Sequence, residues 1–141
     1  MAEADAKRGS EAARPLSPHL SIYAPEVNMV MSIVHRITGA ALYVGTVLVA
    51  WVLIAAASGP EYFDYVTGLL GTWPGLIVLF GYTWALLHHL AGGIRHFIWD
   101  TGHGYDLAMI DILSWATLAV SLTLTLLIWG YILFCAGGAS S

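Results

Sequence analysis

The stretch ITGAALYVGTVLVAWVLIAAA, from Ile37 to Ala57, contains no formally charged residue. Two comparable uncharged stretches follow it, one from Pro74 to Ile94 and one from Ile112 to Ala136. A helix needs about 20 apolar residues to cross the hydrocarbon core of a bilayer, which is roughly 30 Å thick, and each stretch reaches this length. The sequence therefore predicts an all-α membrane protein with three transmembrane helices.

The composition of the chain agrees with a lipid environment. Hydrophobic residues make up 58% of the chain and charged residues only 10%, whereas about 25% of residues are charged in an average soluble protein. The chain has only five Lys and Arg residues, too few for a nucleic-acid-binding surface. Its single cysteine, Cys135, excludes an internal disulfide and a metal site made of cysteines alone.

The three uncharged stretches divide the chain into eight predicted segments. In order, we expect a disordered tail over residues 1–13, a cytoplasmic-face segment over 14–28, a transmembrane helix over 29–57, an outer loop over 58–73, a transmembrane helix over 74–99, an inner loop over 100–110, a transmembrane helix over 111–136 and a tail over 137–141. Pro74 lies where proline is tolerated, in the first turn of a helix. Thr101, Asp106 and Asp111 are the candidate caps for the third helix.

Basic residues predict the orientation of these helices. Three precede the first helix, Arg36 lies about two turns into it, and Arg95 lies near the end of the second. The outer loop and the C-terminal tail contain no Lys or Arg. Because basic residues concentrate on the cytoplasmic side of a membrane, we expect a cytoplasmic N-terminus.

The N-terminal segment from Met1 to Arg14 mixes acidic and basic side chains without an apolar core. This pattern matches neither a secretory signal peptide nor a mitochondrial transit peptide. It favours a bacterial cytoplasmic (inner) membrane over a mitochondrial inner membrane.

The first helix carries polar residues inside the predicted membrane region. Ser32 and Arg36 are spaced i, i+4 and share one helix face, where a hydroxyl and a guanidinium together would suit a carbonyl ligand. His35 points about 100° away from Arg36. Buried charges usually face a cofactor, a partner or a cavity, but snorkelling of Arg36 to the interface and bonding of Ser32 to its own backbone explain the residues equally well.

The second helix carries the run HHLAGGIRH, from His88 to His96. His89 and His96 share one face, about 10 Å apart along the helix, and Gly92 and Gly93 thin the helix between them. A neutral imidazole at this depth is a candidate axial ligand for haem iron, and Arg95 and His96, nearer the water, are candidates to pair with the haem propionates. The alternative is tight helix packing at the glycines with histidines bonded across helices.

The spacing leaves three points open. His88 and His89 point about 100° apart, so both cannot bind the same iron. The second ligand would come either from His35 or from another subunit. Asp100, at the inner end of the second helix, is a solvated interfacial carboxylate, a group that delivers protons to a buried quinone, or an ion-pair partner of Arg95 or Arg36.

Two motifs support a family resemblance. RPLSPHLSIY at residues 14–23, followed by SIVHRITG at residues 32–39, resembles the N-terminal signature of the cytochrome b subunits of succinate dehydrogenases, and HHLAGGIRHFIWD at residues 88–100 is similar to their second signature. The resemblance covers about residues 14–136, with both motifs in the expected order.

The resemblance implies a role for each matching residue. His89 matches the haem b axial ligand, with the other axial histidine supplied by a second, small membrane anchor subunit that joins this chain in one helix bundle. Ser32 and Arg36 match ubiquinone-site residues, and His35, Arg95 and His96 match the vicinity of the haem propionates. Asp100 also matches a family position, whereas His88 departs from the pattern and is interpreted as a packing or partner contact.

The resemblance also implies an assembly, succinate:ubiquinone oxidoreductase, which contains a flavoprotein, an iron–sulfur protein and two membrane anchors. The cytoplasmic-face segment would dock the iron–sulfur subunit, and this chain would not be catalytic alone. Three alternatives remain: the anchor of a fumarate reductase, a stand-alone b-type cytochrome, and a scaffold protein without redox function.

Overall fold

The computed structural model of the chain describes residues 24–138. The predicted tail over residues 1–13, the greater part of the predicted docking segment and residues 139–141 lie outside the described residues. The described part contains helices and no strand: α3 (Val27–Ser58), α4 (Pro60–Leu70), α5 (Trp73–Asp100) and α6 (Leu107–Gly138). The all-α fold class is confirmed.

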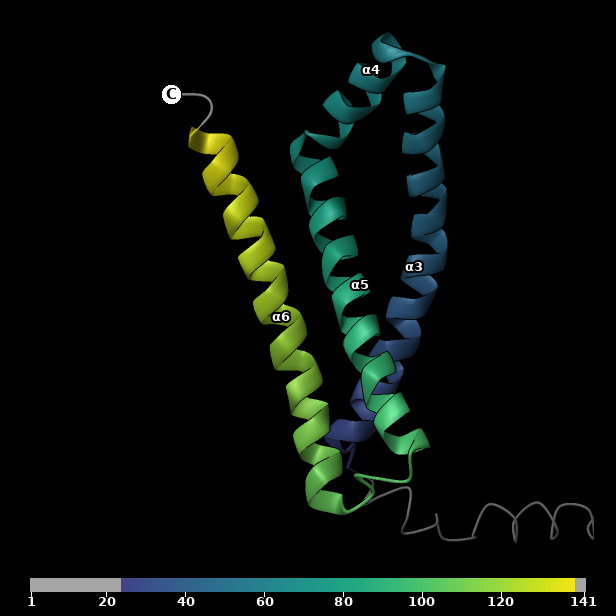
Figure 1. Cartoon of the computed structure of the whole chain (residues 1–141), viewed down its shortest axis with the longest axis vertical. Helices are drawn as coiled ribbons and strands as arrows, with labels where there is room; N and C mark the ends of the chain where they lie inside the picture. The colour runs from purple at the N-terminus through teal and green to yellow at the C-terminus, as the bar shows by residue number, and fades with distance from the viewer. Residues whose placement is uncertain (1–23, 139–141) are drawn as a thin grey trace, which may run out of the picture.

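Three long helices lie side by side, with α5 between α3 and α6 (Figure 1). Helix α4 joins α3 to α5 at one end of the molecule, and a short loop joins α5 to α6 at the other end, where α3 begins. The helices converge at this second end and spread apart toward α4 (Figure 1). We call the converging end the inner end, in keeping with the predicted orientation.

Local sequence explains where the helices begin and end. Gly59 adopts a φ of +122° between α3 and α4, a conformation that glycine reaches without the steric cost of a side chain. Pro60 and Pro74 lie in the first turns of α4 and α5, where no backbone donor is needed. The Asp106 carboxylate accepts a hydrogen bond of 3.0 Å from the backbone N–H of Met109, so Asp106 caps α6.

Two predicted boundaries require correction. The sequence predicts a loop over residues 58–73, but most of this segment forms α4. The helix forms because Pro60 favours a helix start, and because Val66 is buried and the Trp51 indole donates a 2.9 Å hydrogen bond to the Tyr62 hydroxyl. With 11 residues α4 is only about 16 Å long, too short to cross a membrane. Helix α6 begins at Leu107, before the predicted start at Asp111, because Asp106 is its cap.

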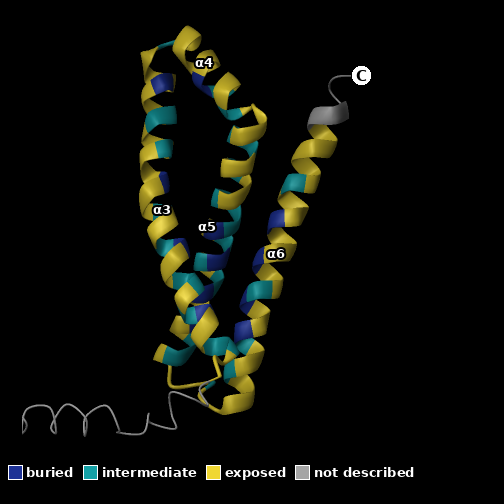
Figure 2. Cartoon of the chain, turned by 180° about the vertical axis from the view of Figure 1, so that it is seen from behind, coloured by how far each residue is buried: buried dark blue, intermediate teal, exposed yellow. Residues whose placement is uncertain are grey.

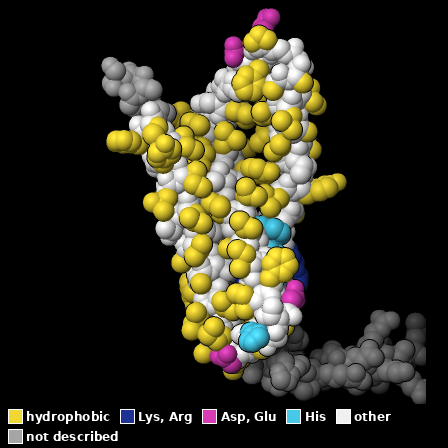
Figure 3. All heavy atoms as spheres, in the orientation of Figure 1, with side chains coloured by type: hydrophobic (Ala, Val, Ile, Leu, Met, Phe, Trp, Pro, Cys, Tyr) yellow, Lys and Arg dark blue, Asp and Glu magenta, His cyan; other side chains and the backbone are white. Residues whose placement is uncertain are grey.

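The outer surface of the long helices is apolar. Three helices, α3, α5 and the part of α6 from Leu107 to Cys135, are long and apolar enough to span a membrane. Most of their residues are exposed, and the buried ones lie along the lines where helices meet (Figure 2). In the space-filling view hydrophobic side chains cover most of the visible face, with acidic side chains near its two ends (Figure 3). Because such a surface is costly in water, lipid and further helices are its natural surroundings.

Candidate functional site

Helix α5 presents two different rows of polar residues to its two neighbours. His89 and His96 lie on the face toward α3, where the ring of His35 contacts both, with centroid distances of 4.0 and 5.2 Å. His88 and Arg95 lie on the face toward α6, where they contact Ser121 and Ser114. The expected separation of His88 from His89 is confirmed.

The rings of His35 and His89 stack face to face. Their planes are 6° from parallel, and the Nδ1 atom of His89 lies 3.1 Å from the backbone carbonyl oxygen of His35. A carbonyl oxygen can only accept a hydrogen bond, so Nδ1 carries the hydrogen. The Nε2 atom of His89 then keeps its lone pair and makes no hydrogen bond within the described chain. A histidine fixed in this tautomer through its other nitrogen has the usual arrangement of a metal ligand.

Glycines permit this close approach of α3 and α5. A Cβ atom at Gly39 would lie 2.9 Å from the ring of His89, and a Cβ atom at Gly92 would collide with Nδ1 of His35. A Cβ atom at Gly93 would meet nothing within 4 Å. The expected close approach therefore occurs at Gly92 and not at Gly93.

The stacking of His35 on His89 bears on whether His35 could be the second ligand to the haem iron. Two axial histidines approach an iron from opposite sides, with their ligating nitrogens directed at each other. His35 instead lies flat against the ring of His89, and its buried Nδ1 has no hydrogen-bond partner among the described residues. The two histidines of this chain are therefore not arranged as an axial pair.

A cavity of about 440 Å³ lies at the inner end between the start of α3 and the end of α5. Eight residues line it: Asn28, Met29, Ser32, Ile33, Arg36, Arg95, His96 and Trp99. Its size is within the range of small-molecule sites. Four of the predicted site residues, Ser32, Arg36, Arg95 and His96, are therefore brought to one cavity.

Ser32 and Arg36 have no hydrogen bond or ion pair within the described chain. The buried Ser114, Thr117, Ser121 and Thr125 of α6, by contrast, each donate to a carbonyl of their own helix. The alternative in which the Ser32 hydroxyl bonds its own backbone therefore has no counterpart in the structure. Both side chains have donors available at the cavity.

On the face toward α6, both polar side chains of α5 bond to the neighbouring helix. The Arg95 guanidinium, 3% exposed, donates to the Ser114 hydroxyl at 3.1 Å and lies 5.0 Å from the Trp99 ring centroid. His88, 1% exposed, contacts the Ser121 hydroxyl at 3.2 Å. That hydroxyl already donates its hydrogen to the Leu118 carbonyl, so His88 is the donor. His88 thus serves in packing.

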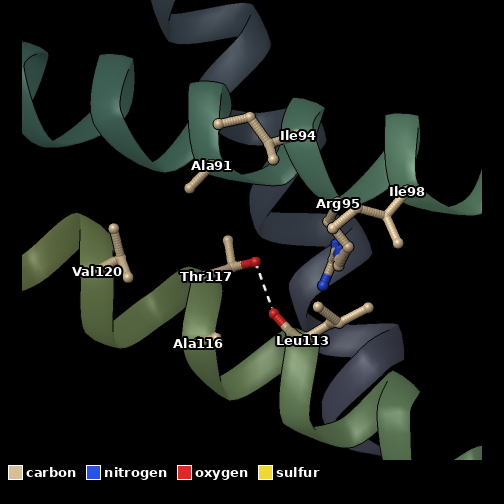
Figure 4. A pocket seen from close by; sticks show the side chains of 8 residues that line it. All are labelled: Ala91, Ile94, Arg95, Ile98, Leu113, Ala116, Thr117 and Val120. Carbon is tan, nitrogen blue, oxygen red and sulfur yellow. Dashed lines mark hydrogen bonds between the residues drawn. The ribbon is translucent and has the colours of Figure 1, made fainter. Parts of the chain in front are cut away.

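A smaller cavity of about 170 Å³ lies between α5 and α6. Figure 4 shows Arg95 at one end of it, among apolar side chains, with Thr117 bonded to the carbonyl of Leu113. The guanidinium is therefore next to both cavities. Its direct hydrogen bond runs to α6, on the side away from His89, and its Nε atom is buried without a partner in the described chain.

Asp100 lies exposed at the last residue of α5. It makes no ion pair with Arg95 or Arg36 within residues 24–138. The pairing considered for this carboxylate is therefore not observed in the described chain.

Two residues near the site, Thr38 and Trp99, make contacts that the sequence pattern does not indicate. Thr38 is 2% exposed and lies beside His89, 3.4 Å from its Nδ1. Trp99 lines the cavity between α3 and α5 and donates to the Gly104 carbonyl at 3.2 Å. The available signal for Thr38 is a hydroxyl inside an otherwise apolar run, one turn after His35.

Three helices that are long and apolar enough to span a membrane, with a histidine-rich inner end, define the class: an integral membrane protein with a polar site between its helices. The family model for the succinate dehydrogenase/fumarate reductase transmembrane subunit matches residues 10–128. The chain belongs to this family.

Individual relatives agree with the family match. The succinate dehydrogenase cytochrome b556 subunit of Paracoccus denitrificans is 41% identical over 124 residues, covering 88% of this chain and 93% of that protein. The subunit of the same name from Rickettsia prowazekii is 36% identical over 116 residues, covering 82% of this chain and 90% of its own length. The mitochondrial cytochrome b560 subunit of Bos taurus is 41% identical over 101 residues, covering 69% of this chain and 59% of its own length. The resemblance and the assignment to a non-catalytic succinate dehydrogenase subunit are confirmed.

Proposed function

We propose that the chain is the cytochrome b anchor of a succinate:ubiquinone oxidoreductase in a bacterial cytoplasmic membrane, with its N-terminus in the cytoplasm. In this proposal His89 supplies one axial ligand to haem b, and Ser32 and Arg36 bind ubiquinone. One observation carries it: these three side chains keep their ligand-binding atoms unpaired within the described chain, whereas Arg95 and His88 bond to α6.

The residues around His89 suit haem b, which would provide one-electron transfer when bound. The His35 carbonyl orients the His89 ring and leaves Nε2 available, and Gly39 leaves room beside it. His35, Arg95 and His96 would hold the propionates, because each carries donors and they cluster toward the inner end. Of these three residues, Arg95 already bonds to Ser114 on α6, which limits how far its guanidinium can extend toward a propionate.

The cavity between α3 and α5 suits the ring of a quinone. The Ser32 hydroxyl would donate to one quinone carbonyl, and the Arg36 guanidinium would stabilise the negative charge that develops there on reduction. Reduction to the quinol takes two electrons and two protons. Asp100, exposed at the end of α5 near the cavity-lining Trp99, is the proposed group for proton delivery from the cytoplasm.

The proposed assembly contains three further subunits. A flavoprotein oxidises succinate, an iron–sulfur protein passes the electrons to the quinone and docks on residues 14–28, and a second, small anchor supplies the other axial histidine. The stacked geometry of His35 and His89 supports a ligand from outside the chain. It equally disfavours a stand-alone b-type cytochrome. The names of the relatives support the succinate dehydrogenase direction over fumarate reductase, and their bacterial sources support the location.

The quinone site is tested by separating two activities of the purified complex. Ser32→Ala and Arg36→Ala should lower succinate:ubiquinone reductase activity tenfold or more, which corresponds to about 1.4 kcal/mol in the barrier. Succinate oxidation with a soluble electron acceptor should stay unchanged. Ser58→Ala is the matched control, since Ser58 lies on the same helix at its outer end and bonds to Ile54. Equal quinone reduction in all three variants would refute the site.

A further inference from the structure

Thr38 lies in the contact between α3 and α5, one helical turn after His35. Its hydroxyl donates to the His35 carbonyl oxygen at 2.9 Å and is 3.4 Å from the His89 Nδ1 atom. That Nδ1 atom is itself 3.1 Å from the same carbonyl oxygen. Two donors, one hydroxyl and one imidazole N–H, therefore converge on a single acceptor.

Sharing an acceptor has a chemical consequence for His89. A carbonyl oxygen that already accepts one hydrogen bond offers less electron density to a second donor. The Thr38 hydroxyl therefore weakens the 3.1 Å bond from the His89 N–H to the carbonyl. Its own oxygen offers that N–H only a longer contact of 3.4 Å in return, so the weakening dominates. A weaker bond at Nδ1 leaves the imidazole closer to neutral and makes Nε2 a weaker electron donor to a metal, since hydrogen bonds to the outer nitrogen raise ligand basicity.

The position of Thr38 is specific. Its side chain is 2% exposed, so water does not replace its hydroxyl, and it faces the histidine whose Nε2 is available for a metal. Thr125, another buried threonine, is 1% exposed and donates to the Ser121 carbonyl of its own helix at 2.7 Å. The two threonines have similar burial and a similar bond to their own helix, but only Thr38 adjoins His89.

We propose that Thr38 is a positioning residue that sets the donor strength of His89 and thereby raises the midpoint potential of the haem. This inference rests on the proposed function of His89 as an axial ligand. Removing the hydroxyl strengthens the bond from His89 to the His35 carbonyl, makes Nε2 a stronger donor, and stabilises the ferric state relative to the ferrous state.

The test is redox titration of the haem in the intact, purified complex, followed by its absorption spectrum. Thr38→Val keeps the branched shape and removes the hydroxyl, and Thr38→Ser keeps the hydroxyl and removes a methyl group. We expect a more negative midpoint potential in Thr38→Val with a low-spin spectrum, and a potential near that of the unaltered complex in Thr38→Ser. Thr125→Val, the matched control, should leave the potential unchanged.

Three results would overturn the proposal: an unchanged potential in Thr38→Val, a shift of equal size in Thr125→Val, or a loss of haem in Thr38→Val that Thr38→Ser shares. The last would assign Thr38 to packing alone. A His89→Ala complex is measured beside them. If it retains the low-spin spectrum, the ligand assignment itself fails; if it loses the spectrum while Thr38→Val has no effect, only the inference about Thr38 fails.

Discussion

On helix α5, His89 faces α3 and His88 faces α6, and similar side chains are bonded differently on the two faces. On the α6 face His88 donates to Ser121 and Arg95 donates to Ser114. Each serine hydroxyl in turn donates to a backbone carbonyl of its own helix. On the α3 face His89 uses only Nδ1, and Nδ1 of His35 has no partner among the described residues. On the α6 face both polar side chains bond to the neighbouring helix, although the Arg95 Nε atom has no partner among the described residues; on the α3 face the ligand-binding Nε2 of His89 is left unpaired.

The difference separates structural from ligand-binding polar residues in a membrane helix. Polar groups in lipid need partners, and hydroxyls from a neighbouring helix meet that need at the α6 face. On the α3 face the chain leaves donors unpaired beside a cavity and a metal-binding nitrogen unpaired on His89, and a ligand or another subunit is expected to complete them. We therefore interpret the α3 face as the functional face and the α6 face as the one that holds the scaffold together.

The largest effect that should distinguish the two faces comes from a pair of neighbouring glycines. In Gly92→Ala the new Cβ collides with the His35 ring, so the stacking on His89 is lost. We expect a destabilisation of about 1–3 kcal/mol from overpacking, together with a weakened or lost haem spectrum. Gly93→Ala, with nothing within 4 Å of the new atom, should leave both unchanged. The check is the haem spectrum and thermal unfolding of both purified complexes; an effect of the same size at Gly93 would refute the specific approach at Gly92.

The next effect, on stability alone, is expected on the scaffold face. Ser114→Ala removes the hydrogen bond from the buried Arg95 and should lower stability by about 1–3 kcal/mol, the cost of an unsatisfied buried group. Thr117→Ala, on the same helix, removes only a bond within α6 and should cost less. The measurement is the denaturation midpoint of each complex. Equal losses in the two variants would mean that Arg95 does not depend on Ser114.

The smallest effect should come from removing the hydrogen bond between His88 and Ser121. Ser121→Ala leaves His88 without its partner on α6, and such contacts in membrane proteins average about 0.6 kcal/mol. Because we assign no haem contact to His88 or Ser121, the midpoint potential should stay constant within error. Stability and potential are measured on the same preparation, and a shifted potential would show that the two faces are not independent.

Much of this arrangement could be predicted from the sequence, because the decisive signals are local. The length of each uncharged stretch indicates a transmembrane helix, and helical spacing alone places His88 and His89 on different faces. The same spacing places Ser32 and Arg36 on one helix face, and both line the cavity between α3 and α5. Helix α4 could not be predicted in this way, because its 11 residues are too few for a membrane signal and include acidic side chains and a glycine that interrupt the apolar pattern.

What could not be predicted depends on how helices pack against each other. The rotation of α5 decides that Arg95 contacts Ser114 on α6, and no local pattern reports that rotation. The stacking of His35 on His89 and the place of Thr38 beside them depend in turn on the approach permitted by Gly39 and Gly92. These contacts join side chains on α3 and α5 that lie far apart in the chain.

The most direct test of the central claim is the reduced-minus-oxidised absorption spectrum of the assembled complex with one histidine replaced on each face of α5. We expect His89→Ala to lose the low-spin haem b spectrum. We expect His88→Ala to keep this spectrum, with lower stability, because His88 bonds only to Ser121 among the residues the structure describes. A low-spin spectrum that survives in His89→Ala, or disappears in His88→Ala alone, would contradict the assignment of His89 as the haem ligand.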